Sequence, residues 1–213
     1  MAKLRKAISV DQLLNTKFIE IPLTGRFREL LGRPEEGGTI FIKGKSGHGK
    51  TTFILQLCKE FSKFGKVLYN SLEEGARKSM QEAVLEQNLT KDEAKRINFL
   101  HREPMPEMRR RLKKSRGLRF VIIDSVQYAF MTAKDYKEMQ AENPKIKFII
   151  NSHILGKNAV GSLARYIEYD ADQKIDVEGF KAFSRSRASR GKLTTPYVIW
   201  HEGADNYWND LKL

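Results

Sequence analysis

The sequence predicts an α/β domain built on a mostly parallel central sheet, with helices on both faces and an antiparallel edge at its C-terminal end. Short apolar runs rich in β-branched and aromatic residues alternate with stretches of helical character, which is typical of parallel strands joined by crossover helices. A glycine-rich motif ending in Lys50-Thr51 lies between one such run and the next helix. The length of 213 residues suits one domain. We expect that domain at residues 23–213, after an N-terminal segment of residues 1–22.

The predicted elements alternate between strand and helix up to residue 150. The expected strands are residues 39–42, 67–70, 97–100, 120–123 and 147–150. The expected helices are residues 52–64, 75–86, 91–96, 107–114 and 125–140. After Ser152 we expect a loop, a short helix at residues 163–169 and three closing strands at residues 174–177, 180–184 and 197–200. We predict that these closing strands form the antiparallel edge.

The composition excludes several classes of protein. Hydrophobic residues make up 40% of the chain and charged residues 31%, so disordered, collagen-like and low-complexity chains are excluded. No apolar run approaches the roughly 18 residues of a membrane span. The single Cys58 cannot form an internal disulfide. We therefore expect a soluble, cytoplasmic protein without a membrane partner.

The basic residues gather in two clusters. The chain has 39 Lys and Arg against 26 Asp and Glu, a net charge of +13. Residues 101–120 are strongly basic and include Arg110 and Lys113, and residues 181–192 contain no acidic residue. Such clusters favour a polyanionic partner, because each phosphate contact releases condensed counterions from nucleic acid. The alternative is that each cluster forms a solvated helix face.

The glycine-rich motif satisfies the eight-position pattern of a phosphate-binding loop. Its residues are Gly44, Lys45, Ser46, Gly47, His48, Gly49, Lys50 and Thr51, with Thr52 following. The glycines let the backbone wrap closely around phosphates, and successive N–H groups with the positive helix end form an anion cradle. We expect Lys50 to reach the β and γ phosphates and the Thr51 hydroxyl to bind Mg²⁺. The motif predicts ATP and Mg²⁺ as cofactors, whereas His48 occupies a free position and is assigned no side-chain role.

A second metal ligand is expected at the end of a central strand. The run Arg119-Phe-Val-Ile-Ile-Asp124 is mainly apolar and ends in a carboxylate. Open α/β sheets bind their ligands at the carboxyl ends of the strands. Asp124 is therefore the candidate for holding Mg²⁺, directly or through water.

With these motifs in place, the chain resembles the RecA-like P-loop ATPase core, and particularly the bacterial RadA (Sms) and DnaB-type helicase group, as a minimal single-domain member. The resemblance covers about residues 23–200. Residues 23–32 are similar to the stretch that precedes the phosphate-binding loop in these proteins, and residues 67–74 to the family strand that ends in a catalytic glutamate. Residues 148–153 look like the strand end that carries a polar γ-phosphate sensor. Residues 183–187 look like the family's Lys-x-Arg element, with Arg185 in place of the Lys.

The resemblance implies specific roles at the ATP site. Glu73 would orient or deprotonate the attacking water, with Glu74 as the alternative. His153 would sense the γ-phosphate and couple its loss to movement of the next loop. Arg185 and Arg187 would reach the γ-phosphate of a neighbouring subunit.

The resemblance also implies the partners. The loop at residues 154–164 corresponds to a DNA-contacting loop, in which Lys157 and Asn158 are the expected contacts, and Arg110 and Lys113 add a second basic surface. The implied protein is a bacterial or phage-encoded DNA-dependent ATPase. It would assemble as a homo-oligomeric ring or filament and act on single-stranded or branched DNA in recombination, repair or replication.

Some features depart from the family pattern. No four-cysteine zinc element precedes the core, no protease-like domain follows it, and Lys157 stands one residue later than in RadA. The alternative function is a nucleotide-switched oligomeric scaffold whose partner is a protein. The basic clusters favour DNA. A phosphotransferase acting on a small molecule is the weakest alternative, because its chemistry would not need Glu73 or the Arg-Ser-Arg element.

Overall fold

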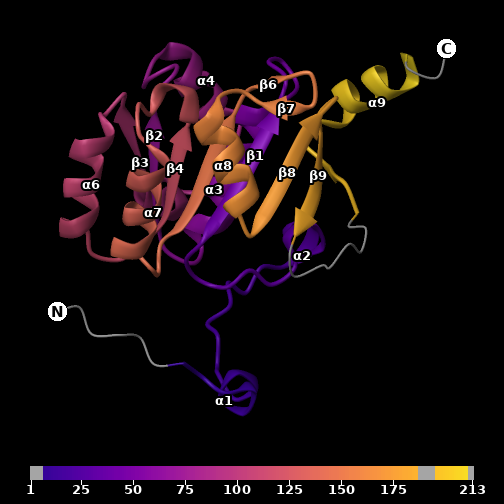
Figure 1. Cartoon of the computed structure of the whole chain (residues 1–213). Coiled ribbons are helices and arrows are strands. Elements are labelled where there is room, and N and C mark those ends of the chain that lie inside the picture. The colour runs from indigo at the N-terminus through magenta and orange to yellow at the C-terminus, as the bar shows by residue number, and fades with distance from the viewer. Residues whose placement is uncertain (1–6, 187–194, 211–213) are drawn as a thin grey trace.

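One sheet carries the loops that form the candidate site. The structure is a computed structural model that describes residues 7–186 and 195–210 (Figure 1). In those residues eight strands form a sheet in the order β10-β9-β8-β1-β5-β4-β2-β3, and β6 and β7 form a separate hairpin. The strands are β1 (Thr39–Gly44), β2 (Lys66–Ser71), β3 (Ile97–His101), β4 (Leu118–Asp124), β5 (Lys147–Ser152), β6 (Ile154–Leu155), β7 (Asn158–Ala159), β8 (Gln173–Glu178), β9 (Lys181–Ser186) and β10 (Tyr197–Val198). The sheet is parallel from β8 to β3, and β9 and β10 extend it antiparallel.

Helices cover both faces of this sheet. They are α1 (Val10–Leu14), α2 (Gly25–Leu31), α3 (Lys50–Ser62), α4 (Lys78–Leu85), α5 (Lys91–Arg96), α6 (Met105–Lys114), the 3-10 turn η1 (Val126–Tyr128), α7 (Ala133–Glu142), α8 (Ser162–Asp170) and α9 (His201–Asp210). One buried cluster joins the sheet to α2 and α3, and another joins its opposite face to α6, α7 and α8. Helix α1 contributes no buried residue and lies apart from the sheet (Figure 1).

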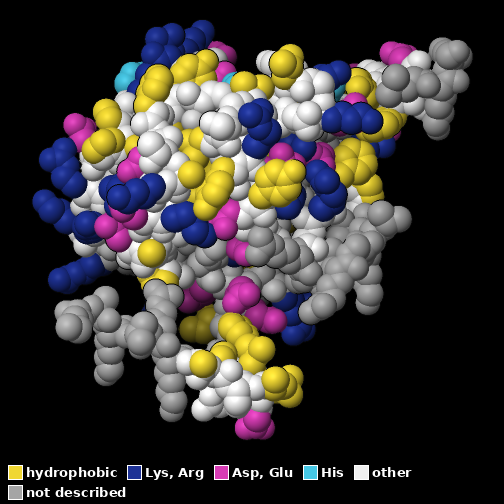
Figure 2. All heavy atoms as spheres, in the orientation of Figure 1, with side chains coloured by type: hydrophobic (Ala, Val, Ile, Leu, Met, Phe, Trp, Pro, Cys, Tyr) yellow, Lys and Arg dark blue, Asp and Glu magenta, His cyan; other side chains and the backbone are white. Residues whose placement is uncertain are grey.

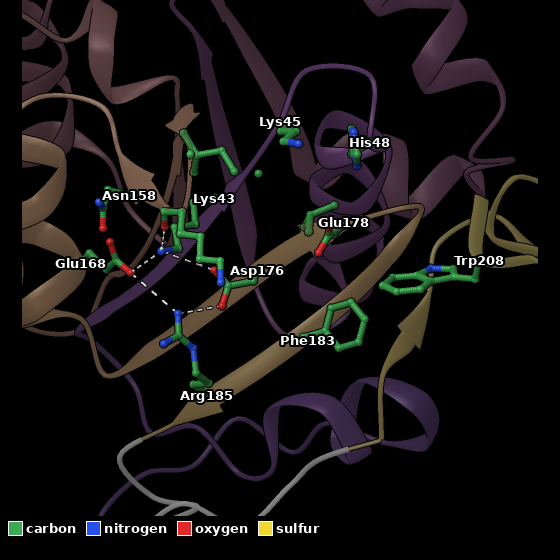
Figure 3. A pocket seen from close by; sticks show the side chains of 15 residues that line it. Lys43, Lys45, His48, Asn158, Glu168, Asp176, Glu178, Phe183, Arg185 and Trp208 are labelled. Carbon is green, nitrogen blue, oxygen red and sulfur yellow. Dashed lines mark hydrogen bonds and ion pairs between the residues drawn. The ribbon is translucent and has the colours of Figure 1, made fainter. Parts of the chain in front are cut away.

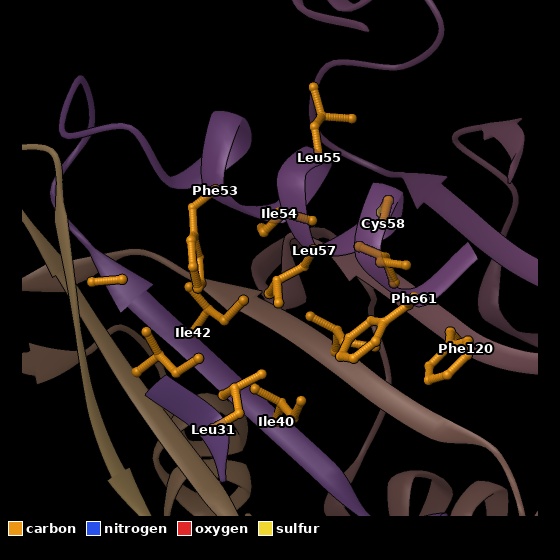
Figure 4. Packing of buried hydrophobic residues seen from close by; sticks show 14 of the residues in the cluster. Leu31, Ile40, Ile42, Phe53, Ile54, Leu55, Leu57, Cys58, Phe61 and Phe120 are labelled. Carbon is orange, nitrogen blue, oxygen red and sulfur yellow. The ribbon is translucent and has the colours of Figure 1, made fainter. Parts of the chain in front are cut away.

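Alternation along β4 sends its side chains into both layers. Phe120 and Ile122 belong to the cluster with α3, whereas Val121 and Ile123 belong to the cluster on the opposite face. Figure 4 shows Phe53, Leu57 and Phe61 of α3 directed toward the sheet, whereas Leu55 points away from it. Phe61 stacks on Phe120 with ring centres 4.5 Å apart. Because both faces are covered, the strand is a continuous apolar run in the sequence.

Parallel pairing brings four strand ends to the same edge of the sheet. β4 lies between β2 and β5, and β5 pairs with β1. The register places Ser71 beside Asp124 and Lys43 beside Ser152. The segments that follow β1, β2, β4 and β5 therefore meet at the carboxyl edge, where the sequence predicts the site.

The expected fold class and the five expected parallel strands are confirmed, but the C-terminal part differs in detail. β8 pairs parallel with β1, so only β9 and β10 form an antiparallel edge. Residues 199 and 200 lie outside β10. Helices α1, α2 and α9 were not expected, and the loop after Ser152 contains the short β6–β7 hairpin.

The single helix expected at residues 125–140 is wrong. The segment forms η1 and then, after a break, α7. Thr132 begins α7 by accepting a hydrogen bond from the Asp135 backbone N–H, while the Asp135 carboxylate accepts from the Thr132 N–H. This reciprocal capping satisfies N–H groups that a continuous helix would have bonded internally.

Candidate active site

The phosphate-binding loop joins β1 to α3, as the sequence predicts. Gly47 and Gly49 have φ angles of +77° and +92°, which only glycine adopts without strain. Gly44 lies so close to β8 that a β-carbon would stand 2.3 Å from the Val177 carbonyl oxygen. The Lys50 ammonium donates a hydrogen bond to the Lys45 carbonyl at 2.8 Å. The loop therefore has the curvature of an anion cradle, with its lysine side chain lying across it.

This loop opens into a cavity of about 680 Å³ at the carboxyl edge. The cavity is lined by Ser46, Gly47, Gly49, Lys50, Thr51 and Thr52 of the loop, and by Glu73, Glu74, Arg77, Ser79, Arg102, Asp124, Asn151, His153 and Phe180 from other segments. Its volume is in the range of small-molecule sites. The fold thus brings Lys50, Thr51, Glu73, Asp124 and His153 together around one space, as the sequence predicts.

Asp124 is a buried carboxylate held by two neighbouring strands. It accepts hydrogen bonds from the Asn151 amide of β5 at 2.5 Å and from the Tyr69 hydroxyl of β2. Burial raises the pKa of the Asp124 carboxyl above its usual range, and these two hydrogen bonds oppose that shift. Because burial makes this carboxylate costly to ionise, a cation bound beside it would be strongly favourable.

The oxygen donors at this edge fit Mg²⁺. The Thr51 hydroxyl and the Asp124 carboxylate line the same cavity, and Mg²⁺ prefers hard oxygen ligands shared with substrate phosphates and water. In the described part of the chain, no group of three His, Cys, Asp or Glu side chains could hold a metal ion. Thr51 and Asp124 would therefore hold Mg²⁺ together with the nucleotide, and the bound ion would neutralise phosphate charge.

The surroundings of the Lys50 ammonium favour the binding of an anion. Burial lowers the pKa of the Lys50 ammonium, and the charges of Asp124 and Glu73 partly offset the shift. Phosphate oxygens would replace the Lys45 carbonyl as acceptors and restore favourable interactions of the ammonium.

Glu73 lies in the loop after β2, where its carboxylate contacts two other strand-end segments. The same oxygen of Glu73 accepts a hydrogen bond from the Ser125 hydroxyl at 3.1 Å and lies 2.8 Å from His153 Nε2. The Arg102 guanidinium donates to the Glu73 carbonyl at 2.7 Å and fixes the loop from β3. Glu74 instead accepts from the Ser79 hydroxyl. Of the two glutamates, Glu73 therefore has the contacts expected of an oriented general base.

The structure adds residues to this site that the sequence motifs do not specify. Tyr69 and Asn151, which hold Asp124, are buried polar residues inside strands. A polar residue within an apolar strand was the available signal, because buried polar side chains need partners. Phe180 has a φ of +58° and lies over Gly49, whose β-carbon would stand 3.2 Å from its ring.

His48, which was assigned no role, ties the loop to the C-terminal part of the domain. Its Nδ1 accepts a hydrogen bond from the Gly179 N–H at 2.9 Å, in the turn between β8 and β9. Its ring packs edge-on against Tyr207 of α9, with ring centres 5.3 Å apart. Burial lowers the pKa of the His48 imidazole, in line with a neutral ring that accepts this bond.

Arg185 lies in a different cavity, of about 900 Å³, between β9 and α8 (Figure 3). Its guanidinium is 2.7 Å from the Asp176 carboxylate and 3.8 Å from that of Glu168, and both acids also pair with Lys43. Lys45 and His48 line this cavity as well, while Arg185 does not line the phosphate-loop cavity. Arg187 lies outside the described residues. A role of either arginine toward a neighbouring subunit stays a prediction.

The basic cluster of residues 101–120 is largely neutralised within the domain. On α6, Lys113 pairs with Glu142 at 3.3 Å and Arg110 with Glu107 at 3.8 Å. Arg109 is 3.1 Å from Glu142. Lys157 and Asn158, by contrast, lie exposed at the tip of the β6–β7 hairpin.

Comparison with known proteins places this geometry in a family. Residues 28–147 match the AAA domain family, which is more than half of the chain and includes the phosphate-binding loop, Glu73 and Asp124. The chain belongs to this family. An AAA domain of this kind is a P-loop ATPase, and use of a nucleotide with Mg²⁺ is usual for such domains. No curated protein matches the chain. None of the helices in the described part of this AAA domain is long and apolar enough to cross a membrane.

Proposed function

We propose that this AAA domain is a DNA-dependent ATPase of the RadA or DnaB type, which assembles as a ring or filament. It would act on single-stranded or branched DNA in recombination, repair or replication. One observation carries the proposal: two loops beside the nucleotide cavity form an exposed surface of aromatic, aliphatic and basic side chains without a carboxylate. We call these the η1 loop, residues 125–132, and the β6–β7 hairpin, residues 153–161.

The composition of this surface favours nucleic acid. Residues 125–134 and 151–167 contain no Asp or Glu, although acidic residues are frequent elsewhere in the chain. Phe130 is 92% exposed and Leu155 is 82% exposed. Lys157 of the hairpin and Arg165 of α8 are exposed as well. Cations that contact phosphates and aromatic faces that stack on bases are the recurring components of single-strand binding sites.

Phe130 is presented in an unusual way. It has a φ of +44°, which is unfavourable for an aromatic residue, and its side chain is almost fully exposed. Both features oppose stability, so a role on the surface explains them better than packing does. The hairpin lies at the top of Figure 1, and Figure 2 shows hydrophobic side chains among Lys and Arg side chains along that part of the molecule.

The chemistry proposed for the cavity is attack of water on the γ-phosphorus. Glu73 would accept the proton of that water while the bond to the β-phosphate oxygen breaks, releasing ADP and phosphate. Lys50 would stabilise the charge that develops on the phosphate oxygens. The contacts of Ser125 and His153 with Glu73 would keep its carboxylate oriented.

ATPase rates with no nucleic acid, single-stranded DNA, duplex DNA and RNA test the proposal. We expect single-stranded or branched DNA to raise the rate severalfold, and the effect to weaken as salt increases. An equal rate under all conditions would contradict a DNA-dependent ATPase and favour the scaffold with a protein partner. Absence of ATP hydrolysis with every nucleic acid would contradict the enzymatic part of the proposal.

A further inference from the structure

Gln127 of η1 is hydrogen-bonded to both ends of the β6–β7 hairpin. Its amide group donates to the Ser152 hydroxyl and to the Val160 carbonyl, both at 2.9 Å. Its side-chain oxygen accepts from the His153 N–H at 3.3 Å. One half-buried side chain thus joins the end of β4 to the start and the end of the hairpin.

The same residues touch the candidate general base. His153, whose backbone is bonded to Gln127, places its ring nitrogen 2.8 Å from Glu73. Ser125, two residues before Gln127, donates to the same Glu73 oxygen. A closed set of contacts therefore runs from Glu73 through His153 and Gln127 back to Ser125.

Apart from Gln127, two contacts hold the hairpin: the Lys43 ammonium donates to the Lys157 carbonyl at 2.9 Å, and Ala159 is buried in the core. Its ladder consists of the pairs Ile154 with Ala159 and Leu155 with Asn158, and a ladder this short is marginal by itself. The Val160 N–H closes its base by donating to the His153 carbonyl at 3.0 Å. Gln127 therefore fixes the base of the hairpin beside the nucleotide cavity, while Lys43 and Ala159 hold its tip and β7.

We propose that Gln127 is a positioning residue that couples occupancy of the nucleotide site to the position of the β6–β7 hairpin. A γ-phosphate near Glu73 and His153 would change the contacts of the His153 ring. Because the His153 backbone and Val160 are both bonded to Gln127, the hairpin would move or tighten with it. The coupling to nucleotide follows from these contacts, and its consequence for DNA rests on the function proposed above.

Hydrogen exchange of the hairpin amides tests this without DNA. Three proteins are compared, each with and without a non-hydrolysable ATP analogue and Mg²⁺: the unsubstituted chain, Gln127→Leu and the control Gln81→Leu, at an exposed glutamine of α4. In the unsubstituted chain and the control, the analogue should slow exchange at residues 154–160. In Gln127→Leu these amides should exchange about tenfold faster, since lost hydrogen bonds open the segment, and the analogue should no longer slow them.

Two results would overturn the proposal. One is a hairpin in the unsubstituted chain that does not respond to the analogue although the analogue binds. The other is a response that persists in Gln127→Leu. Gln127→Glu, which keeps the side-chain length but loses both N–H donors, gives the same test if Gln127→Leu does not fold. Failure of the DNA proposal is seen separately, as an unsubstituted ATPase that does not respond to DNA while its hairpin still responds to the analogue.

Discussion

At the scale of single residues, Asp124 shows how a binding site can oppose stability. The carboxylate is buried, and its hydrogen bonds do not prevent burial from raising its pKa. Between the ordinary and the raised pKa the folded chain binds more protons than the unfolded chain. The protonated Asp124 carboxyl therefore stabilises the folded chain at low pH, and this stabilisation is lost as the pH rises through that window.

Asp124→Asn should therefore stabilise the nucleotide-free protein at neutral pH. The amide oxygen can accept from Asn151, and the amide N–H can donate to the Tyr69 hydroxyl, so both contacts survive without a buried charge. We expect the melting temperature to rise by about 2–4 °C, equivalent to roughly 1 kcal/mol, while Mg²⁺-dependent nucleotide binding is lost. Thermal melting and nucleotide titration with and without Mg²⁺ measure both effects. A lower melting temperature would show that the ionised carboxylate stabilises the empty site.

Glu73→Gln should separate binding from hydrolysis. The amide keeps the shape of the side chain but cannot accept the proton of the attacking water. ATP should bind with little change, while turnover should fall by ~10² to 10⁴. Single-turnover hydrolysis with a nucleotide-binding assay measures the two steps. Glu74→Gln is the matched control, because Glu74 bonds to Ser79 instead of the Glu73 network, and a slow Glu74→Gln with a normal Glu73→Gln would reverse the assignment.

At the scale of elements, the η1 loop should contribute binding energy through Phe130. Removing one stacking partner of a base costs ~1–3 kcal/mol, so Phe130→Ala should weaken single-stranded DNA binding by about 5- to 150-fold. Its melting temperature should not fall, because the ring is 92% exposed. Fluorescence anisotropy with a labelled oligonucleotide is the measurement. Tyr169→Ala is the control, since Tyr169 is 80% exposed on α8 but lies outside both loops; an equal loss in both variants would argue against stacking on Phe130.

The elements that the sequence predicts are those with local causes. The central strands are apolar runs because both faces of the sheet are covered, and the phosphate-binding loop follows from its own glycines and lysine. The break between η1 and α7 was detectable in the Thr132-x-x-Asp135 cap. Helix α2 also has a local signal, since Phe27, Leu30 and Leu31 follow a helical spacing toward the core.

Other features depend on contacts between distant segments and leave no local pattern. Gln127 belongs to a segment with mixed helical and loop character, and its partners lie 25 to 33 residues later. The indole N–H of Trp208 donates to the Gly179 carbonyl at 3.0 Å, which positions α9 on the turn between β8 and β9. The candidate site was predictable where a motif specifies a residue, and not where the fold supplies a supporting contact.

At the scale of the whole molecule, the net charge of +13 does not by itself locate a surface that binds nucleic acid. Glu138 and Glu142 of α7 pair with Arg109 and Lys113 of α6. These pairs offset part of the positive charge of residues 101–120. Lys157 lies exposed in a segment without acids, residues 151–167, and the Glu168 and Asp176 carboxylates nearby are already paired with Lys43 and Arg185. We therefore expect the position of each cation on the surface, and whether an acid already pairs with it, to decide which cations contact DNA.

Charge reversal at the two places separates these contributions. Lys157→Glu should abolish most DNA-stimulated ATPase, whereas Arg110→Glu with Lys113→Glu should change mainly the weak, salt-sensitive background binding. ATPase rates over a range of DNA and salt concentrations make the comparison. Loss of stimulation in the α6 variant alone would place the DNA on the basic helix and not on the β6–β7 hairpin.

We expect assembly of subunits to complete the ATP site. The phosphate-loop cavity is lined by Lys50, Arg77 and Arg102, of which Arg102 donates to the Glu73 and Glu74 carbonyls. Arg185 is engaged by Asp176 and Glu168 in the other cavity. A cation opposite the leaving phosphate accelerates such reactions by ~10³ or more, so we expect a neighbouring subunit to supply it, with Arg187 as the candidate from the sequence. Arg187→Ala should bind ATP but hydrolyse it slowly, and hydrolysis by the unsubstituted chain should rise with protein concentration as subunits assemble.

Mixing Arg187→Ala with the inactive Lys50→Ala creates interfaces that pair an intact Lys50 with an intact Arg187, so part of the activity should return. Because neither variant alone has such an interface, recovery can come only from an arginine acting between subunits; mixed assemblies shown by cross-linking that remain inactive would argue against it.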